Sequence, residues 1–556
     1  MNSITEYNKQ SELALASYAN LIPGVDPIPA LQDNAVGMSS TQANKFVEKW
    51  QVVSRYIDDT TGLSATVFED KETGAKHLAV RGTEPTGQDI LADGLLAGGL
   101  PSTLNPQFIA LRSKLNNDWL TDPEILQGQS FTVSGHSLGG YLAAAAKQSY
   151  TQVTDAYLYN APGVGGLLGN LADALGSLFG MGSISPDNIW NIRGSEGFSI
   201  IAGLGYQLGT QVRIQTEATS NTHSISLLTD ALAVYSLYSQ LFPDQSVKQL
   251  TEIIDAFGST KDAGLSNKNT FEFALDALRT IIQNPGNGRI VLDDTFKTVT
   301  DNRESFYVSL QNLLDDQKFK DLSGIVQVTP FSDMNVGDIF TMAAGNGAQG
   351  LATRFALTAL NPFVLASVDY TALNTDGALD LLDPVNGAGT ITDQYLIDRA
   401  TLLTRKLWFN TNDENPYNPS AQVDIHNFNI HQYLKSDIYF EDAATGYKIQ
   451  QGALFGNTPR YFFGSDAAET PAGSASKDRL YGGGGDDTFQ GLEGHDYLEG
   501  GRRADTYIIN QGDGIDTILD VGGFCVIQFD TVVERDRTVI ANDSNRKTGD
   551  RGAIHA

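Results

Sequence analysis

One serine stands in a setting that could make it a covalent catalyst. Ser137 is flanked by Gly135 and Gly139, which completes the pattern G-x-S-x-G, and residues 131–134 before it are β-type. Small residues follow, including alanine at 143–146, in a helical pattern. Between a strand and a helix this pattern is the nucleophile elbow, a tight turn that exposes the serine hydroxyl at the end of the strand. The sequence therefore predicts that Ser137 is a nucleophile, with the helix N-terminus favouring a developing oxyanion.

A serine nucleophile needs a general base, and the chain has only seven histidines. His223 lies in a polar loop between a predicted strand and a predicted helix, where the base of an α/β-hydrolase belongs. His136 is beside the nucleophile with its side chain expected to point away, and His77 begins a strand at the wrong end. The other histidines lie in the helical region, the repeats or the tail: His426, His431, His495 and His555. His223 is the predicted base.

The acid of the triad is expected between the serine and the histidine along the chain, just past the end of a strand. The predicted strand 188–192 is followed by a loop that contains Glu196, the leading candidate. This carboxylate would hold the imidazole tautomer and stabilise the imidazolium. The alternatives are Asp187, Glu217 and, least suitable because it precedes its strand, Asp155.

An oxyanion hole requires a backbone N–H after the nucleophile, here that of Leu138, and another from the end of an earlier strand. The Arg-Gly-Thr run 81–83, together with residues 135–140, resembles the class 3 lipase family. The resemblance implies that Thr83 contributes its backbone N–H and hydroxyl. Residues 90–100 and 164–181 are candidates for an apolar lid, although the second stretch reads slightly better as a helix packed on the sheet.

These residues must be positioned by an α/β fold. Residues 50–56, 63–68 and 77–81 are β-like and separated by turn residues, which predicts antiparallel hairpins. Further β-like segments then alternate with helical stretches, which predicts a parallel sheet with an antiparallel edge. These segments are 131–134, 156–159, 189–192 and 212–215. With a helical lead-in, residues 1–240 form the predicted α/β-hydrolase domain.

The middle of the chain, residues 241–460, follows a helical period, as in 247–257, 271–282 and 392–407. It carries no motif that indicates chemistry. We expect a helical body that packs against the hydrolase-like part.

The last region, residues 461–556, contains a repeat. An aspartate recurs every nine residues, with glycines before it and an apolar residue two positions after it; two extra residues precede the last repeat. Glycine carbonyls and aspartate carboxylates in stacked turns form oxygen cages suited to Ca²⁺. A parallel β-roll is predicted. The predicted ligands are Asp478, Gly483, Gly485, Asp487, Gly494, Asp496, Asp505 and Asp516.

The repeat resembles the RTX Ca²⁺-binding β-roll of proteins exported by bacterial type I secretion. The resemblance implies an extracellular protein that folds in Ca²⁺ outside the cell and has the type I secretion apparatus as a partner. The N-terminus has no signal-peptide pattern and the single cysteine excludes an internal disulfide framework, as expected for this route.

The composition narrows the possible functions. A net charge of −29 argues against nucleic-acid binding, and no run of 18 apolar residues could span a membrane. We therefore expect a secreted carboxylic-ester hydrolase that acts on lipid esters at a lipid–water interface, either a triacylglycerol lipase or a phospholipase A1. The alternative is a calcium-dependent extracellular binding or surface protein with a non-catalytic hydrolase scaffold. A third possibility is an enzyme of the same fold that cleaves other acyl groups, such as a polyester or a thioester.

Overall fold

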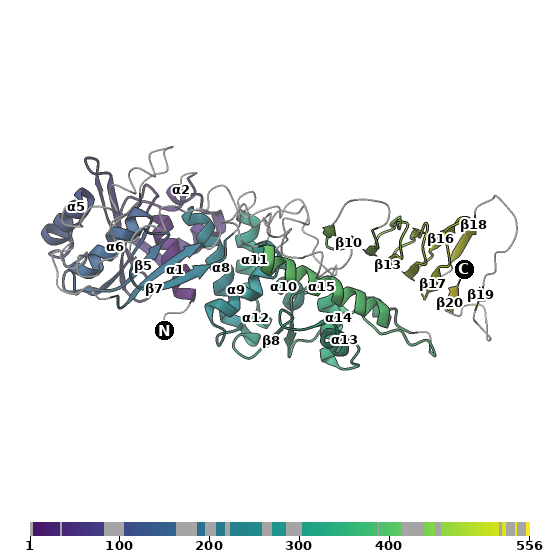
Figure 1. Ribbon diagram of the computed structural model, residues 1–556. Helices are drawn as coiled ribbons and strands as arrows, with labels where there is room; N and C mark the ends of the chain where they lie inside the picture. The colour runs from purple at the N-terminus through teal and green to yellow at the C-terminus, as the bar shows by residue number, and fades with distance from the viewer. Residues whose placement is uncertain are drawn as a thin grey trace. The chain divides into compact units, whose positions relative to one another are not determined.

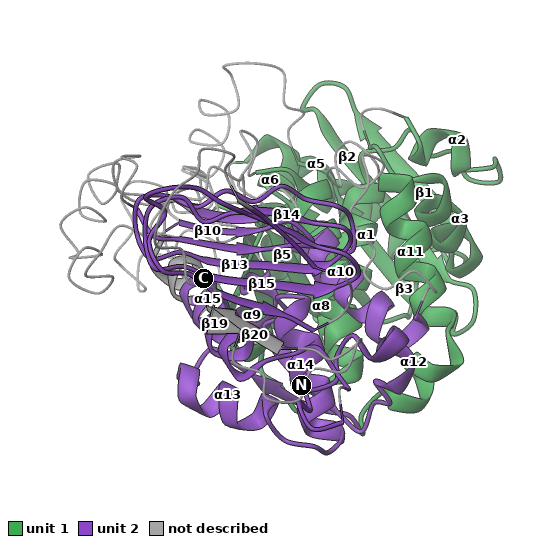
Figure 2. Ribbon diagram, turned by 90° about the vertical axis from the view of Figure 1, so that its right-hand side faces the viewer, with its two compact units in different colours: residues 1–251, 294–325 green, residues 252–293, 326–556 purple. Residues whose placement is uncertain are grey.

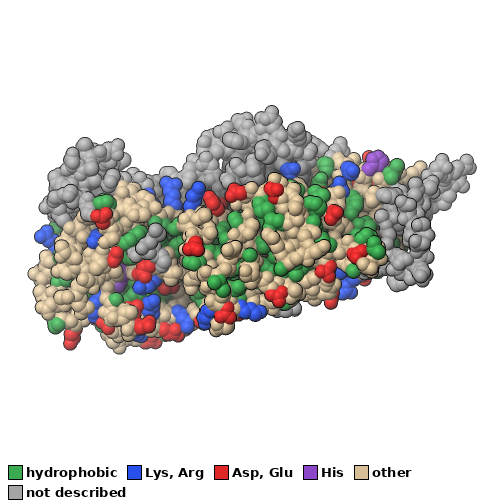
Figure 3. Space-filling view, turned by 90° about the horizontal axis from the view of Figure 1, so that it is seen from below, with side chains coloured by type: hydrophobic (Ala, Val, Ile, Leu, Met, Phe, Trp, Pro, Cys, Tyr) green, Lys and Arg blue, Asp and Glu red, His purple; other side chains and the backbone are tan. Residues whose placement is uncertain are grey.

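The computed structural model of the chain divides into two compact units (Figures 1 and 2). Unit 1 comprises residues 1–251 and 294–325, and unit 2 comprises residues 252–293 and 326–556. The described residues are 4–33, 36–82, 105–162, 186–194, 207–216, 223–257, 270–284, 303–386, 388–413, 439–450, 458–521, 525–529, 540–541 and 552–555. Among them, no helix combines the length and the apolar character that a membrane crossing requires. On the face drawn in Figure 3, Lys and Arg side chains lie among Asp and Glu side chains.

A seven-stranded sheet organises unit 1, and its strands lie side by side in chain order. The first two pairings are antiparallel, and all pairings from β3–β4 onward are parallel. This confirms the predicted parallel sheet with an antiparallel edge. The strands are β1 (Trp50–Asp58), β2 (Leu63–Asp70), β3 (Lys76–Val80), β4 (Phe131–His136), β5 (Val153–Tyr159), β6 (Ile189–Gly194) and β7 (Thr210–Ile214).

Helices pack on the sheet through faces with small or apolar side chains. α6 (Leu138–Ser149) contacts β3, β4 and β5 through buried glycines and alanines. A Cβ on Gly140 would lie 2.6 Å from the Cβ of Ala161, so this close approach requires glycine. α1 (Ile4–Ala16) contacts the same strands and also α8 (Ile225–Leu241). Other helices of this unit are α2 (Ile28–Leu31), α3 (Ser40–Lys49), α5 (Pro106–Lys114), η2 (Leu115–Trp119), α11 (Arg303–Asp315) and α12 (Gln317–Leu322).

The three helices predicted in the middle of the chain are present. They are α9 (Val247–Asp255), α10 (Thr270–Gln283) and α15 (Asp393–Asp413). The same region also holds α13 (Val336–Ala343), α14 (Ala348–Thr358), η5 (Thr371–Leu373), η6 (Thr375–Gly377) and an antiparallel pair of strands, β8 (Gln327–Pro330) and β9 (Phe363–Ala366). The helical period does not predict this small sheet. The domain boundaries at residues 240 and 460 remain a proposal.

The nonapeptide repeats form a parallel β-roll, in which each strand pairs with the strand two repeats later. One sheet holds β12 (Arg460–Phe463), β13 (Arg479–Gly484), β15 (Tyr497–Arg502) and β17 (Thr517–Asp520). The other holds β14 (Thr488–Gln490), β16 (Thr506–Ile509) and β18 (Val526–Phe529). The first sheet continues into β10 (Tyr439–Asp442) and β11 (Tyr447–Gln450) at one edge, and into β20 (Gly552–His555) and β19 (Ile540–Ala541) at the other.

The interior of the roll is apolar. Side chains two positions after each repeat aspartate are buried there, as the sequence predicts: Leu480, Phe489, Leu498, Tyr507 and Ile518. The two extra residues before the last repeat appear as a register shift, because Tyr497 pairs with Arg479 on one side and with Thr517 on the other. The roll therefore absorbs the insertion without losing its stacking.

Candidate active site and calcium-binding repeats

Ser137 occupies a strained turn between β4 and α6. Its backbone has φ 55° and ψ −129°, a conformation that a residue with a side chain rarely adopts. The turn is fixed by two hydrogen bonds: the Ser137 N–H donates to the Tyr159 carbonyl at 2.9 Å, and the Gly140 N–H donates to the Ser137 carbonyl at 2.9 Å. The strand, turn and helix therefore have the geometry of a nucleophile elbow.

The glycines that flank the serine are required by the close approach of the backbone. A Cβ on Gly135 would lie 2.1 Å from the Gly139 carbonyl oxygen, and one on Gly139 would lie 2.2 Å from the Val80 carbonyl oxygen. We expect Gly139→Ala to lower the free energy of unfolding by roughly 3 kcal/mol, because β3 and α6 must separate to accept the methyl group. Urea unfolding measures this change. Gly347→Ala is the control, since nothing lies within 4 Å of that Cβ position. An equal effect of both substitutions would contradict the steric argument.

His223 lies beside this turn, between β7 and α8. The Nε2 of His136 contacts the His223 carbonyl oxygen at 2.7 Å, and the two imidazole rings have centroids 4.8 Å apart. His223 follows β7 and precedes α8 along the chain. The residue next to the serine in sequence is thus in contact with the predicted base.

The side chain of His136 makes two hydrogen-bond contacts that the sequence did not indicate. A carbonyl oxygen only accepts hydrogen bonds, so Nε2 of His136 carries the hydrogen that bonds His223. In the neutral ring, Nδ1 then accepts from the Tyr18 hydroxyl at 2.8 Å. Burial, and next the neighbouring His223, lower the pKa of His136 well below its usual value, which keeps the ring neutral. Tyr18, His136 and the His223 backbone therefore form one hydrogen-bonded chain.

The side chain of Asn160 links the backbone of His223 to the end of β6. Its side-chain amide donates to the His223 carbonyl at 3.5 Å, and its Oδ1 accepts the Gly194 N–H at 3.1 Å. Because β4, β5 and β6 are parallel, β6 ends at the edge of the sheet that carries Ser137. The chain leaves this edge at Gly194, shortly before Glu196, which lies outside the described residues.

The alternative acids have different places. Asp187 precedes β6 and Asp155 lies near the start of β5, so both are at the opposite end of the parallel strands from the serine. Glu217 lies outside the described residues. Because β7 is parallel to β6, Glu196 and Glu217 both follow strands that end at the edge that carries Ser137.

The segment expected to supply the oxyanion hole passes close to the nucleophile. A Cβ on Gly82 would lie 3.1 Å from the Cβ of Ser137 and 2.4 Å from the His136 carbonyl oxygen. Thr83, the next residue, lies outside the described residues. Leu138 is buried and begins α6, so its backbone is at the helix N-terminus beside the serine. Both lid candidates, 90–100 and 164–181, also lie outside the described residues.

His77 is part of the core. It is buried, with Nε2 2.9 Å from the Ser134 hydroxyl, and burial lowers its pKa well below the usual value. His426 and His431 lie outside the described residues. His495 contacts the backbone of Ile515 within the roll.

In the roll, the repeat aspartates are buried and bonded in the same way. Each uses Oδ1 to accept the backbone N–H of a residue two repeats earlier. For example, the Asp478 N–H donates to Asp496 at 2.8 Å and the Asp487 N–H donates to Asp505 at 2.9 Å. The aspartates of successive coils are therefore stacked in register.

The second carboxylate oxygen of these aspartates is directed at the glycine turns. Within the described residues, Oδ2 of Asp487, Asp496 and Asp505 is buried and has no hydrogen-bond partner. A Cβ on Gly482 would lie 2.2 Å from Oδ2 of Asp487, and one on Gly500 would lie 2.2 Å from Oδ2 of Asp505. Unpaired carboxylate oxygens beside backbone carbonyls are a donor set that fits Ca²⁺.

The raised pKa values of the repeat aspartates also favour a bound cation. Burial, and then neighbouring carboxylates, raise the pKa of Asp496 to about 8 and that of Asp505 to about 7. In the described residues, no three Asp, Glu, His or Cys side chains converge as a metal cluster. Backbone carbonyls would therefore have to complete each coordination shell, as in the glycine turns where Gly483 and Gly485 have φ of 88° and 131°. Arg503 stands in such a glycine position with φ 83°, which weakens that turn.

The roll has one more coil before the repeats that the sequence predicts. β12 pairs in parallel with β13, and the Glu469 N–H donates to Asp487 at 2.7 Å, as a repeat aspartate would. The signal was available, because Gly464 and Glu469 continue the nine-residue frame toward the N-terminus. Glutamate in place of aspartate concealed it.

Comparison with known proteins identifies the repeats. The family of RTX calcium-binding nonapeptide repeats (4 copies) matches residues 472–507. The chain therefore contains calcium-binding RTX repeats, and the predicted resemblance of this region is confirmed. No curated protein sequence matches the chain.

Solved structures of lipases are similar to part of the chain. The Lip2 lipase of Yarrowia lipolytica is 18% identical with a TM-score of 0.25, over 38% of this chain and 78% of that one. Lipase II of Rhizopus niveus is 17% identical with a TM-score of 0.26, over 39% and 82%. The Rhizomucor miehei lipase in its propeptide complex is 16% identical with a TM-score of 0.27, over 38% and 68%. The seven-stranded sheet and the elbow at Ser137 themselves have the arrangement of an α/β-hydrolase fold.

Proposed function

We propose that the chain is a secreted serine ester hydrolase that acts on lipid esters, with Ser137 as nucleophile, His223 as base and Glu196 as acid. The observation that carries this proposal is the strained backbone of Ser137, φ 55° and ψ −129°, at an elbow next to His223. A binding scaffold has no use for this strain, whereas a nucleophile must project from its strand to reach substrate.

The proposed reaction begins with attack of the Ser137 hydroxyl on the acyl carbonyl, while His223 takes its proton. The backbone N–H groups of Leu138 and Thr83, with the Thr83 hydroxyl, would stabilise the oxyanion. His223 then gives the proton to the leaving alcohol. Water enters, the acyl-enzyme is hydrolysed and the fatty acid leaves. In this scheme His136 and Tyr18 position the loop that carries the base.

The test is covalent labelling followed by assays on emulsions. A fluorophosphonate should label the folded, Ca²⁺-loaded protein at Ser137, and hydrolysis should be measured on a triglyceride and on a phospholipid emulsion. Faster release from the triglyceride indicates a lipase, and faster release from the phospholipid indicates a phospholipase A1. No labelling would instead favour a calcium-dependent extracellular binding protein, and labelling without lipid hydrolysis would favour an esterase for other acyl groups.

The pH profile tests the acid. Burial lowers the pKa of His223 to about 4. A carboxylate bonded to the imidazole favours its charged form and raises this pKa. The base must be neutral, so kcat/KM is lost as the pH falls through the pKa of His223. We expect Glu196→Gln to move the acidic midpoint down toward the value set by burial and to lower kcat by a factor on the order of 10⁴.

Asp187→Asn is the matched control and should leave both the midpoint and kcat unchanged, since Asp187 precedes β6 at the far end of the sheet. A shift produced by Glu217→Gln instead would assign the acid to Glu217.

We also propose that the protein works outside the cell, after export by a type I secretion apparatus. The support is the RTX repeat, whose crowded carboxylates need abundant free Ca²⁺ to stack.

A further inference from the structure

One outward face of the β-roll is covered rather than exposed to solvent. Phe463, Tyr481 and Glu499 occupy the same register position in three successive coils. Their neighbours along the strands, including Leu480 and Leu498, fill the interior, so these three side chains point out of the roll. All three are nevertheless buried, with at most 4% of their surface exposed.

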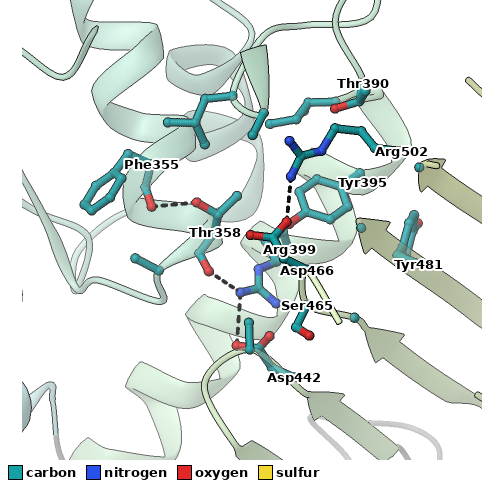
Figure 4. A pocket seen from close by; sticks show the side chains of 18 of the residues that line it. Phe355, Thr358, Thr390, Tyr395, Arg399, Asp442, Ser465, Asp466, Tyr481 and Arg502 are labelled. Atoms are coloured by element: carbon teal, nitrogen blue, oxygen red, sulfur yellow. Dashed lines mark hydrogen bonds and ion pairs between the residues drawn. The ribbon is translucent and has the colours of Figure 1, made fainter. Parts of the chain in front are cut away.

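Helix α15 provides the cover through its aromatic and cationic side chains (Figure 4). The ring of Tyr395 meets Phe463 and Tyr481 edge-on, with centroids 5.8 and 5.3 Å apart. The guanidinium of Arg399 lies 4.8 Å from the centre of the Phe463 ring and pairs with Asp442 of β10 at 3.1 Å. Stacked aromatic rings on two coils thus form the surface that receives the helix.

Buried polar contacts fix the position of α15 on this surface. The Tyr481 hydroxyl donates to Asp398 at 2.5 Å, and the Thr392 hydroxyl, just before α15, donates to Glu499 at 2.8 Å. The Tyr497 hydroxyl also donates to Glu499 at 2.8 Å. Buried carboxylates that lose such partners are costly, so these contacts require the strands to be stacked in register.

The strands that receive α15 run directly into the calcium-binding turns. Tyr481 is followed by the turn that ends in Asp487, and Glu499 by the turn that ends in Asp505. Without a cation, the stacked carboxylates repel one another and oppose the same register that α15 needs. Calcium in the turns and α15 on the outer face therefore stabilise one arrangement of the strands.

We propose that α15 and the helices packed on it, α13 and α14, belong to the calcium-dependent folding unit of the roll. Calcium orders the strands, the strands form the surface for α15, and the helical region becomes ordered with them. By reciprocity of linked equilibria, docking of α15 also strengthens calcium binding to the roll. These three helices thus complete the roll, and their order depends on its calcium content.

Hydrogen–deuterium exchange on the full chain tests this proposal, in Ca²⁺ and in excess EGTA. Peptides from residues 393–407 should lose protection in EGTA together with peptides from β13 and β15, whereas peptides from α8 of unit 1 keep theirs. Unchanged protection of α15 in EGTA overturns the proposal, whether or not the roll peptides lose theirs.

A pair of variants tests the reverse direction of the coupling. Tyr395→Ala removes the ring that contacts two coils, and we expect it to raise the Ca²⁺ concentration at the midpoint of roll protection by about tenfold. Ile397→Ala on the same helix is the control: this residue is 36% exposed, and its truncation should leave the midpoint unchanged. Tyr481→Phe keeps the ring and removes only the hydroxyl bond to Asp398, so it should raise the midpoint by a smaller factor. Equal midpoints for the wild type and both tyrosine variants overturn the coupling.

Discussion

Replacing Ser137 with alanine is expected to lower ester hydrolysis by a factor on the order of 10⁴ to 10⁶, because the group that forms the acyl-enzyme is removed. The fold should survive. The backbone bonds of the elbow, to Tyr159 and Gly140, do not use the side chain. Alanine has a Cβ atom like serine, so the backbone strain at φ 55° should persist in the variant. The measurement is initial rate on emulsified triglyceride and phospholipid, with the melting temperature recorded in parallel.

Ser134→Ala is the matched control, since Ser134 lies on the same strand and its buried hydroxyl contacts His77 at 2.9 Å. It should cost about 1 kcal/mol of stability through the lost hydrogen bond and leave kcat/KM nearly unchanged. Full activity in the Ser137→Ala protein would remove the proposed mechanism, because no second residue at the elbow carries a comparable hydroxyl on a strained turn.

The sheet could be predicted because its signals are local. Each strand of unit 1 is a short β-type run bounded by turn residues, and antiparallel or parallel pairing follows from the length of the connection. The elbow could also be predicted from a local signal, since Gly135, Ser137 and Gly139 are close together in sequence. Its consequence, the positive φ of Ser137, follows from the motif.

The support of the base could not be predicted, because it depends on residues far apart in sequence. Tyr18 reaches His136 only because α1 packs across β3, β4 and β5. From its place inside the elbow, the His136 side chain is expected to point away from the nucleophile. The ring donates a hydrogen bond to the His223 carbonyl, a contact that the elbow motif alone does not reveal.

The burial of the outward face of the roll by α15 could not be predicted for a similar reason. The nonapeptide pattern specifies the inward apolar positions and the metal turns, but it leaves the outward positions free. Tyr481 and Glu499 are ordinary residues for a solvated face, and only the contacts with Asp398 and Thr392 show that the face is buried. Which distant segments contact each other depends on tertiary packing, and a single sequence does not show this.

Removing calcium is expected to unfold the roll. Each site that is occupied at a thousandfold excess of free Ca²⁺ over its Kd stabilises the folded state by about 4 kcal/mol. In EGTA this free energy is lost, and the buried carboxylates of Asp487, Asp496 and Asp505 are left without a partner for Oδ2 among the described residues. Calorimetry should show the melting temperature of unit 2 lowered by roughly 10 °C for each such site that is lost. Circular dichroism should report the loss of strand.

A charge-matched pair of variants separates ligation from general electrostatics. Asp496→Asn and Glu493→Gln each replace a carboxyl group by an amide of the same shape, but Asp496 is buried in the stack and Glu493 is exposed. In Ca²⁺, Asp496→Asn should lower the melting temperature, because an anionic ligand is lost. In EGTA the same variant should be as stable as the wild type or more stable, because repulsion with Asp478 and Asp516 is relieved. Glu493→Gln should have little effect in either condition. Equal destabilisation by Asp496→Asn with and without Ca²⁺ would mean that the aspartate is structural and holds no metal.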